Sequence, residues 1–329
     1  MVSITKALNE ATDAEGGYTV PEIFSRKMYD IVTSSAVVLN DLETVRMESN
    51  VVYFPKVTSG TTAYWVDETA SITESQPGFG RITLTAKKIA SLVPASSEVL
   101  EDNNVQLANY LVERMAKDLG LQIDYKILMG GCTTANNTGA TDSPFAGLYH
   151  TASYVNAVDA AGNTNQTGAW GTGSSVTASN ITLKAISQAV VEVLKDNHEQ
   201  PDVSYFNPRT VGSLMQLTDS TSRPVLNNET FGSPLVREGV VGKIYGTNVK
   251  QSNQVPIDLA YGTTSAQKAC SDALVGRSKA FGIYGIRRNF VWKTDYVIDN
   301  DYYKWQTTAR VAFAVKYPES YCLIRGILN

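Results

Sequence analysis

The sequence is poor in the residues that build metal and disulfide centres. Its 329 residues include two histidines, His150 and His198, and three scattered cysteines. There is no His-x-x-x-His or Cys-x-x-Cys pair, the usual spacing of a structural zinc site. An odd number of widely separated cysteines argues against a disulfide framework and indicates assembly in a reducing compartment. We therefore expect no metal, no cofactor and no disulfide.

Motifs for nucleotide binding and nucleophilic catalysis are also missing. No Gly-x-Ser-x-Gly elbow is present, and the nearest phosphate-loop fragment, residues 239–243, is too short. The acidic pair Glu101 and Asp102 is better interpreted as the start of a helix than as an acid/base pair. We predict that the protein is not an enzyme. The rival from another class is a hydrolase built from scattered Asp, Glu and Ser residues, which would be a small oligomer with an acidic pocket.

Strong net charge and long apolar runs are absent as well. Lys and Arg total 28 against 32 Asp and Glu, a net charge of −4, so we expect no tight grip on nucleic acid. No run of eighteen apolar residues occurs, so we expect no membrane partner. A hydrophobic content of 43% in a chain of this length is enough for two lobes or one large elaborated domain.

The most regular pattern in the chain is a long helix over Asn104–Met129. Its apolar residues recur in steps of three and four, and further leucines widen the stripe, so we expect burial on more than one side. Asp102 and the two asparagines after it can cap the start, and Gly130 and Gly131 suit the left-handed end. At 1.5 Å per residue this helix would be roughly 39 Å long.

Two strand patterns flank a long polar loop. Val51–Val57 is β-branched and aromatic, with Pro55 typical of an edge strand, and a second strand starts at Ile82. The apolar phase slips near Lys87, which predicts a β-bulge. The loop, Thr58–Arg81, carries aromatic residues that gain nothing in solvent. Two interpretations stay open: the hairpin projects and docks on another surface, or it folds back on its own domain.

Helical signals recur on both sides of this region. Residues 1–15 are small and polar, typical of an extended arm, and residues 22–32 have the spacing of a short amphipathic helix. A loop-rich section follows the long helix. It ends where Ser179 or Asn180 can cap an amphipathic helix that reaches Leu194.

The C-terminal half adds strands. Residues 203–206 form a strand pattern, after which Asn207 and Pro208 suit the cap and the first position of a helix. Residues 290–296 and 306–316 alternate in polarity, which predicts half-buried strands of about ten residues. The sequence therefore predicts an α+β fold with one rod-like helix and long antiparallel strands.

Six separated segments carry a family resemblance. They are EGGYTVP at 15–21, AYWVDETASITESQPGFGRITLTAKKIASLVPASSEVLED at 63–102, SPFAGL at 143–148, YFNPRTVGSLMQLTDSTSRPVL at 205–226, GKIYGTNVKQSNQVP at 242–256 and ARVAFAVKYPESYCLI at 309–324. In order and spacing the chain resembles the major capsid proteins of tailed bacteriophages, which have the Hong Kong ninety-seven type fold. The likeness covers nearly the entire chain.

The resemblance implies a division of the chain into an N-terminal arm, a peripheral (P) domain with a projecting E-loop and a spine helix, and an axial (A) domain. The expected ranges are 1–40 for the arm and the start of the P domain, 41–132 for the P domain with its E-loop at about 50–90 and spine helix at about 104–129, 133–285 for the A domain, 286–318 for P domain strands, and 319–329 for a C-terminal return to the A domain.

The resemblance also implies a function. Such proteins assemble as hexamers and pentamers into an icosahedral shell enclosing phage double-stranded DNA, which we expect to be contacted weakly. The expected partners are further copies of the chain, a portal protein and a scaffolding protein, with assembly in the host cytoplasm and a final place in the virion. The alternatives with the same fold are an encapsulin-like compartment and a gene-transfer-agent shell. The candidate inter-subunit residues in the E-loop are Tyr64, Trp65, Asp67, Glu68, Phe79 and Arg81.

Two departures from the family pattern limit what carries over. Some members crosslink covalently through an E-loop lysine, whereas residues 57–86 contain no lysine, so we predict no such isopeptide bond. Other members carry a fused scaffolding region ahead of the arm. Only fifteen residues precede Gly16, so we expect the scaffolding protein to be separate.

Overall fold

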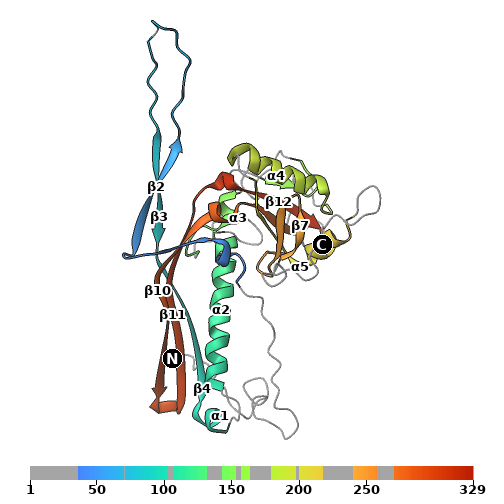
Figure 1. Cartoon of the computed structure of the whole chain (residues 1–329). Coiled ribbons are helices and arrows are strands. Elements are labelled where there is room, and N and C mark those ends of the chain that lie inside the picture. The colour runs from blue at the N-terminus through green and yellow to red at the C-terminus, as the bar shows by residue number, and fades with distance from the viewer. Residues whose placement is uncertain are drawn as a thin grey trace.

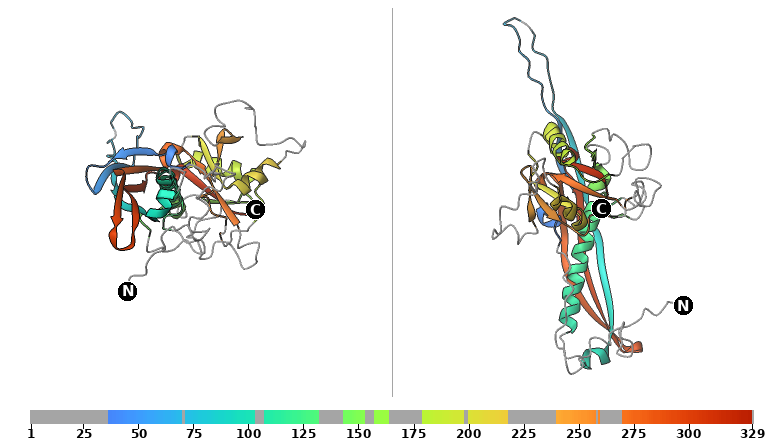
Figure 2. Two further views of the ribbon diagram at one scale, coloured as in Figure 1. Left: turned by 90° about the horizontal axis from the view of Figure 1, so that it is seen from below. Right: turned by 90° about the vertical axis from the view of Figure 1, so that its right-hand side faces the viewer.

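The computed structural model describes residues 36–69, 71–102, 107–131, 143–152, 157–163, 179–197, 200–217, 240–257, 259 and 270–328. In these ranges the chain forms an elongated body, a compact lobe at one end of it, and a narrow hairpin that projects beyond both (Figure 1). The views in Figure 2 show the same three parts from below and from the side. The fold is α+β, as the sequence predicts.

The elongated body is a four-stranded sheet with one long helix against it. The strand order is β1 (Glu43–Arg46), β10 (Gly282–Val297), β11 (Tyr302–Val315) and β4 (Lys87–Ser96). Helix α2 (Leu107–Met129) lies along β4 and β11, as Figure 1 shows. The short elements η3 (Leu39–Asp41), α1 (Ser97–Asp102) and η6 (Ile298–Asn300) complete this part.

The compact lobe is a six-stranded sheet covered on both faces. Its strands are, in spatial order, β5 (Ala157–Asp159), β12 (Tyr321–Leu328), β9 (Cys270–Gly276), β6 (Val203–Phe206), β8 (Thr247–Gln251) and β7 (Val240–Ile244). Helices α4 (Leu183–Asn197) and α5 (Pro208–Met215) share one buried cluster with one face. The other face packs on the end of α2 and on α3 (Leu148–Ala152). Helix α6 (Ser278–Phe281) and η7 (Pro318–Ser320) join the lobe to the body.

The hairpin is a separate two-stranded sheet of β2 (Val51–Ser59) and β3 (Gly78–Thr85). The bulge predicted near Lys87 is wrong. Between Thr85 and Lys87 the chain leaves one sheet and enters another, and the Ala86 N–H donates to the Asn50 carbonyl at 2.8 Å. The apolar phase slips there because β3 and β4 bury their side chains against different neighbours.

The long helix ends as its glycines predict. Gly130 donates its N–H to the Lys126 carbonyl at 2.8 Å, and Gly131 has φ of +82°, the left-handed C-cap conformation. The predicted start of the long helix was wrong in part. Glu101 and Asp102 do not begin this helix but close the short helix α1, and residues 103–106 lie outside the described residues. The expected arm, the helix at 22–32 and much of the loop-rich section lie outside them too.

Helix caps in the compact lobe follow local chemistry. Asn207 caps α5, accepting from the Arg209 N–H at 3.0 Å, with Pro208 in the first turn as predicted. The cap predicted for α4 was misplaced: the Ala185 N–H donates to Thr182 Oγ1 at 3.2 Å. Ser179 instead forms an isolated β-bridge with Ile327, because the chain is still extended at that point.

The C-terminal strands are longer than predicted, and β11 is more deeply buried than predicted. β10 has 16 residues and β11 has 14, and their antiparallel pairing runs from Gly282 opposite Val315 to Val297 opposite Tyr302. The alternation predicted half-buried strands, but Ala309 and Ala312 of β11 are both buried although they point to opposite faces. The core around α2 covers one face there, and the cluster at the root of the hairpin covers the other.

No helix within the described ranges is long and apolar enough to span a membrane. The same residues contain no group of three or more His, Cys, Asp or Glu side chains placed to hold a metal ion.

Candidate assembly surface

The root of the hairpin is anchored in its own small core. Leu84 is fully buried, and Met47 and Ala86 are buried around it, with side chains of β10 and β11 closing the cluster. β2 and β3 pair from Val51 opposite Thr85 to Ser59 opposite Gly78. The root therefore fixes the direction in which the hairpin leaves the body.

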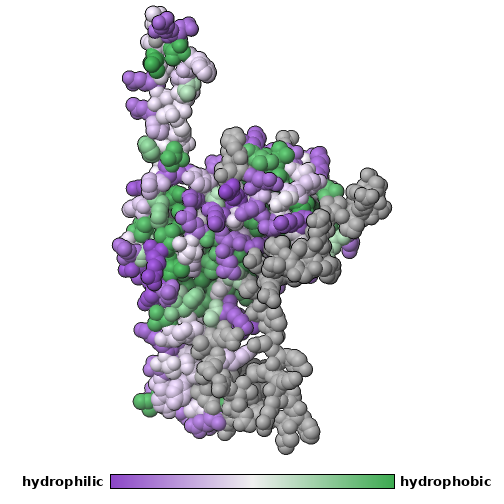
Figure 3. Space-filling view, in the orientation of Figure 1, coloured by the Kyte–Doolittle hydropathy of each residue, from purple (hydrophilic) through white to green (hydrophobic). Residues whose placement is uncertain are grey.

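Beyond the root the hairpin carries large apolar side chains that nothing in the described part of the subunit covers. In the tip, residues 60–69 and 71–77, Trp65 is 105% exposed and Ile72 is 78% exposed. On the strands, Phe79 is 73% exposed and lies opposite Val57, which is also exposed. Figure 3 shows hydrophobic residues spaced along a hairpin that stands clear of the body. Of the two interpretations left open by the sequence, the projecting hairpin is the one observed.

The tip also carries charge of one sign. Asp67, Glu68 and Glu74 are exposed, and residues 57–80 contain no lysine or arginine. Two side-chain hydroxyls link the two sides of the hairpin. Ser75 Oγ donates to the Thr62 carbonyl at 3.0 Å, and Gly78 donates its N–H to Ser59 Oγ at 2.9 Å. The result is a narrow, acidic and aromatic projection.

A second feature anchors the chain near the end of the range expected for the arm and the start of the P domain, residues 1–40. Asp124, buried on α2, accepts three consecutive backbone N–H groups, from Val37 at 2.6 Å, Val38 at 3.2 Å and Leu39 at 2.8 Å. Burial raises the pKa of Asp124 to about 6, although the three N–H donors act in the opposite direction. One carboxyl group therefore ties this segment to the middle of the molecule.

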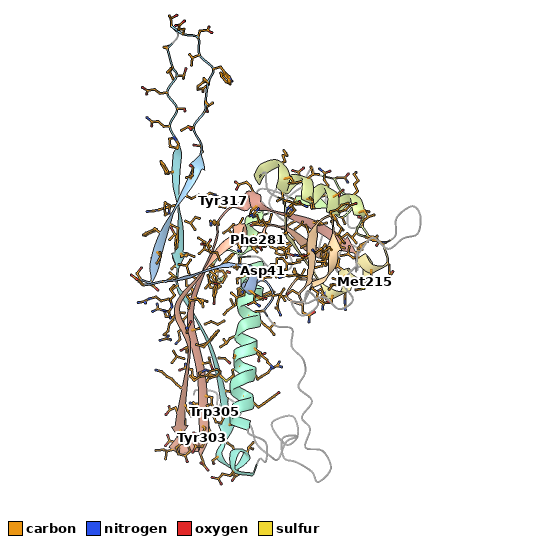
Figure 4. The ribbon with its side chains drawn as sticks, viewed as in Figure 1. Asp41, Met215, Phe281, Tyr303, Trp305 and Tyr317 are labelled. Atoms are coloured by element: carbon orange, nitrogen blue, oxygen red, sulfur yellow. The ribbon has the colours of Figure 1, made fainter. Side chains whose placement is uncertain are left out.

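The same segment is tied to the compact lobe through Asp41. Lys250 Nζ lies 2.7 Å from Asp41 Oδ1, with both side chains largely buried, and the Tyr205 hydroxyl donates to Asp41 Oδ2. Burial, followed by the charge of Asp41, raises the pKa of Tyr205 well above its usual range. Asp41 lies where the body and the lobe meet (Figure 4). The body and the lobe are therefore both tied to residues 37–41.

A groove of about 670 Å³ lies between β4 and α2. Lysines 87, 88 and 126 line it, together with apolar residues such as Ile89 and Leu119. Its acidic residue Asp118 already pairs with Arg114 at 3.2 Å. The lining of this groove is therefore basic and apolar, unlike the acidic pocket that the hydrolase interpretation predicts.

Residues 16–326 match the model of the phage capsid family. The chain belongs to that family. It is a major capsid protein, a structural subunit that associates with copies of itself in a viral shell.

Solved structures give the same fold for this capsid protein. The capsid of an empty GTA particle is 18% identical, has a TM-score of 0.65, and the match covers 98% of this chain and 100% of that one. The Microbacterium phage Oxtober96 structure is 16% identical with a TM-score of 0.65, over 96% and 99% of the two chains. The Mycobacterium phage Adephagia structure is 17% identical with a TM-score of 0.64, over 95% and 97%. No curated protein matches the sequence.

The capsid protein's candidate contact residues fall into two groups. Tyr64, Trp65, Asp67 and Glu68 lie together in the exposed tip, as the sequence places them. Phe79 and Arg81 lie lower, on β3, and the Arg81 guanidinium stacks 4.9 Å from the centre of the Tyr53 ring in its own hairpin. Whether these six residues touch another subunit stays a prediction.

Sequence reasoning left some exposed apolar residues off the list of contacts. Val57 and Ile72 belong with Trp65 and Phe79 by their exposure, and Val57 could have been found from its cross-strand partner once the hairpin was paired. Trp292 and Tyr296 of β10 are a larger omission: they were expected to be half-buried but are 37% and 44% exposed, because α2 packs mainly against β4 and β11.

Proposed function

We propose that this capsid protein assembles as hexamers and pentamers into an icosahedral shell that encloses double-stranded DNA. The observation that carries the proposal is the projecting hairpin, whose fully exposed Trp65 and neighbouring apolar groups have nothing to cover them within the described part of the subunit. A side chain of that size gains stability only when it is buried, and a neighbouring subunit supplies the surface. The hairpin is then the E-loop, with Tyr64, Trp65, Asp67, Glu68, Phe79 and Arg81 as contact residues.

The described elements fit the proposed division into domains. The body with α2 as its spine corresponds to the P domain, residues 41–132 and 286–318, with the E-loop at about 50–90. The six-stranded lobe corresponds to the A domain, residues 133–285, to which β12 adds a C-terminal strand at 319–329. The two ties at Asp41 and Asp124 support an arm at 1–40 that starts from a fixed point between these domains.

The proposed partners follow from this role. They are further copies of the chain, a scaffolding protein, a portal protein, and DNA that is contacted weakly and without sequence preference. The net charge of −4 supports weak contact, since a shell that bound DNA tightly would carry a basic excess. We propose assembly in the host cytoplasm and no catalytic role, in keeping with a structural family.

Electron microscopy and sedimentation of the purified protein test the proposal. Closed shells, or rings of five and six subunits, are the expected products at high protein concentration. A monodisperse monomer under every assembly condition would contradict it.

A second candidate is the head of a gene-transfer agent, favoured by the match to GTA capsids over 98% of this chain at 18–19% identity. The nucleic acid in particles from the native source distinguishes the two. A phage head contains phage DNA, whereas a gene-transfer particle contains fragments of host DNA. Shells filled with enzyme and free of nucleic acid would support an encapsulin-like compartment instead.

A further inference from the structure

The four-stranded sheet carries exposed aromatic side chains beside α2. Trp292 and Tyr296 of β10 are 37% and 44% exposed. Thr294, which lies between them, is opposite Trp305 of β11, and Trp305 packs with Met115 of α2. Alternate residues of a strand share a face, so Trp292 and Tyr296 lie on the face that carries α2. We call these two side chains the aromatic shelf.

The flank of α2 that is turned toward β10 carries small residues. Asp118 and Gln122 line the groove on the β4 side of the helix. Since successive residues of a helix are about 100° apart, Ala116 and Gly120 lie on the opposite flank. β10 lies on the far side of β11 from β4 (Figure 1). This flank of α2 therefore adjoins the aromatic shelf, and its small residues let another segment approach the helix closely.

The described part of the chain begins beside this same flank. The Cβ of Ala36 lies 4.0 Å from the position that a Cβ on Gly120 would take. Asp124, one helical turn further along α2, accepts the N–H groups of the three residues that follow Ala36. Only residues 33–35, which span at most roughly 10 Å, separate this point from residues 22–32. Residues 22–32 are therefore within reach of the shelf.

Residues 22–32 lie outside the described residues, but their sequence matches the shelf in character and in length. Phe24, Met28 and Ile31 recur in steps of four and three, the pattern of one apolar helical face. A helix over these positions would be roughly 16 Å long. The four strand steps between the two shelf residues span roughly 13 Å. One short amphipathic helix is therefore long enough to cover the whole shelf.

We propose that residues 22–32 pack as a helix on the aromatic shelf of their own subunit, in the corner between β10 and α2. The apolar face of this helix covers Trp292 and Tyr296, and Gly120 leaves room for the helix beside α2. The inference concerns the single subunit and does not depend on the proposed shell. It limits the part of the chain that can extend to other subunits to residues 1–21, a reach of at most roughly 70 Å.

Oxidative labelling of the unassembled, full-length protein tests the proposal. Hydroxyl radicals modify exposed tryptophans, and the fully exposed Trp65 provides an internal standard. In the wild type, Trp292 should be labelled as slowly as the buried Trp305. In the variant Phe24→Asp with Ile31→Asp, Trp292 should be labelled several-fold faster. The reason is that each apolar side chain removed from a buried site weakens docking by about tenfold or more.

The matched control is Ser25→Asp with Thr33→Asp, which adds the same charge on the polar side of the proposed helix. Labelling of Trp292 in this control should equal that of the wild type. Circular dichroism and melting curves show that each variant folds. If the first variant fails to fold, Trp292→Ser with Tyr296→Ser takes its place, and the amides of residues 22–32 should then exchange hydrogen faster than in the wild type.

The outcomes separate this inference from its rivals and from the proposed function. Trp292 labelled as fast in the wild type as in the first variant overturns the inference. Protection that rises with protein concentration would place a second copy on the shelf, and protection that requires another protein would place a different partner there; both results overturn it. A wild-type protein that protects Trp292 but forms no shells supports the inference and contradicts the proposed function.

Discussion

Replacing Trp65 by Ala should separate assembly from folding. In the subunit the indole is fully exposed, so its removal deletes no buried contact. Exposed substitutions of this kind change the free energy of unfolding by no more than about 0.5 kcal/mol. The melting temperature of unassembled Trp65→Ala subunits should therefore equal that of the wild type within a few degrees.

In the shell the same substitution should weaken the contacts between subunits. A tryptophan buries about 150–250 Å² at an interface, and truncation of such an anchor costs about 2–4 kcal/mol. Since each factor of ten corresponds to about 1.4 kcal/mol, each tip contact should weaken roughly 30- to 1,000-fold. Every subunit contributes one tip, so the loss is repeated throughout the shell.

Light scattering and sedimentation velocity over a range of protein concentrations measure this effect. Trp65→Phe, which keeps an aromatic ring, should assemble at concentrations between those of the wild type and Trp65→Ala. Val191→Ala, an exposed apolar position on α4, serves as the control for loss of a surface side chain. If Trp65→Ala lowers the melting temperature and leaves assembly unchanged, the tip belongs to the core of its own subunit and the reasoning is refuted.

Two further predictions concern the stability of the subunit, and a third concerns crosslinking in the shell. Because the pKa of Asp124 is about 6 when folded and 3.8 otherwise, its contribution to the free energy of unfolding should rise by up to about 3 kcal/mol as pH falls from 7 to 4. Urea titrations of Asp124→Asn should not show this rise in the free energy of unfolding. A dependence on pH equal to that of the wild type would contradict the prediction. Gly147→Ala should lower the free energy of unfolding by about 1–3 kcal/mol, since an added Cβ would lie 2.5 Å from the Gly130 nitrogen. Gly120→Ala should raise it by up to about 1 kcal/mol, since the added Cβ would meet only the Ala36 Cβ at 4.0 Å. Equal melting temperatures for the two variants would refute this prediction. Denaturing gels of assembled shells should show no covalent ladder, because residues 57–86 contain no lysine.

The parts of the fold that could be predicted from the sequence are those with local signals. The period of α2, its two terminal glycines and the Asn207–Pro208 helix start all depend on residues close together in the chain. The passage of the chain from one sheet to another at Ala86 could not be predicted, because the alternation of apolar and polar residues in a strand does not reveal which strand it pairs with. The exposure of Trp292 was missed for a similar reason: the pattern marks an apolar face but does not say whether α2 covers it.

The same distinction applies to the candidate surfaces. The tip could be predicted because aromatic residues are unusual in a long polar loop. All of this signal lies within one short segment of the sequence. The row formed by Lys88, Arg310 and Arg288 could not be predicted, since these residues come together only through the register of three strands far apart in the sequence. Asp124 left a weak signal, a lone carboxylate beside Ile123 in the apolar stripe of α2, but its three backbone partners follow from tertiary structure alone.

The most direct test of the central claim is a cryo-electron microscopy reconstruction of the assembled protein. We predict a closed shell in which Trp65 is buried against an adjacent subunit and the projecting hairpin contacts that neighbour along its length. A shell with Trp65 still in solvent, or with the hairpin folded back on its own body, would contradict the claim.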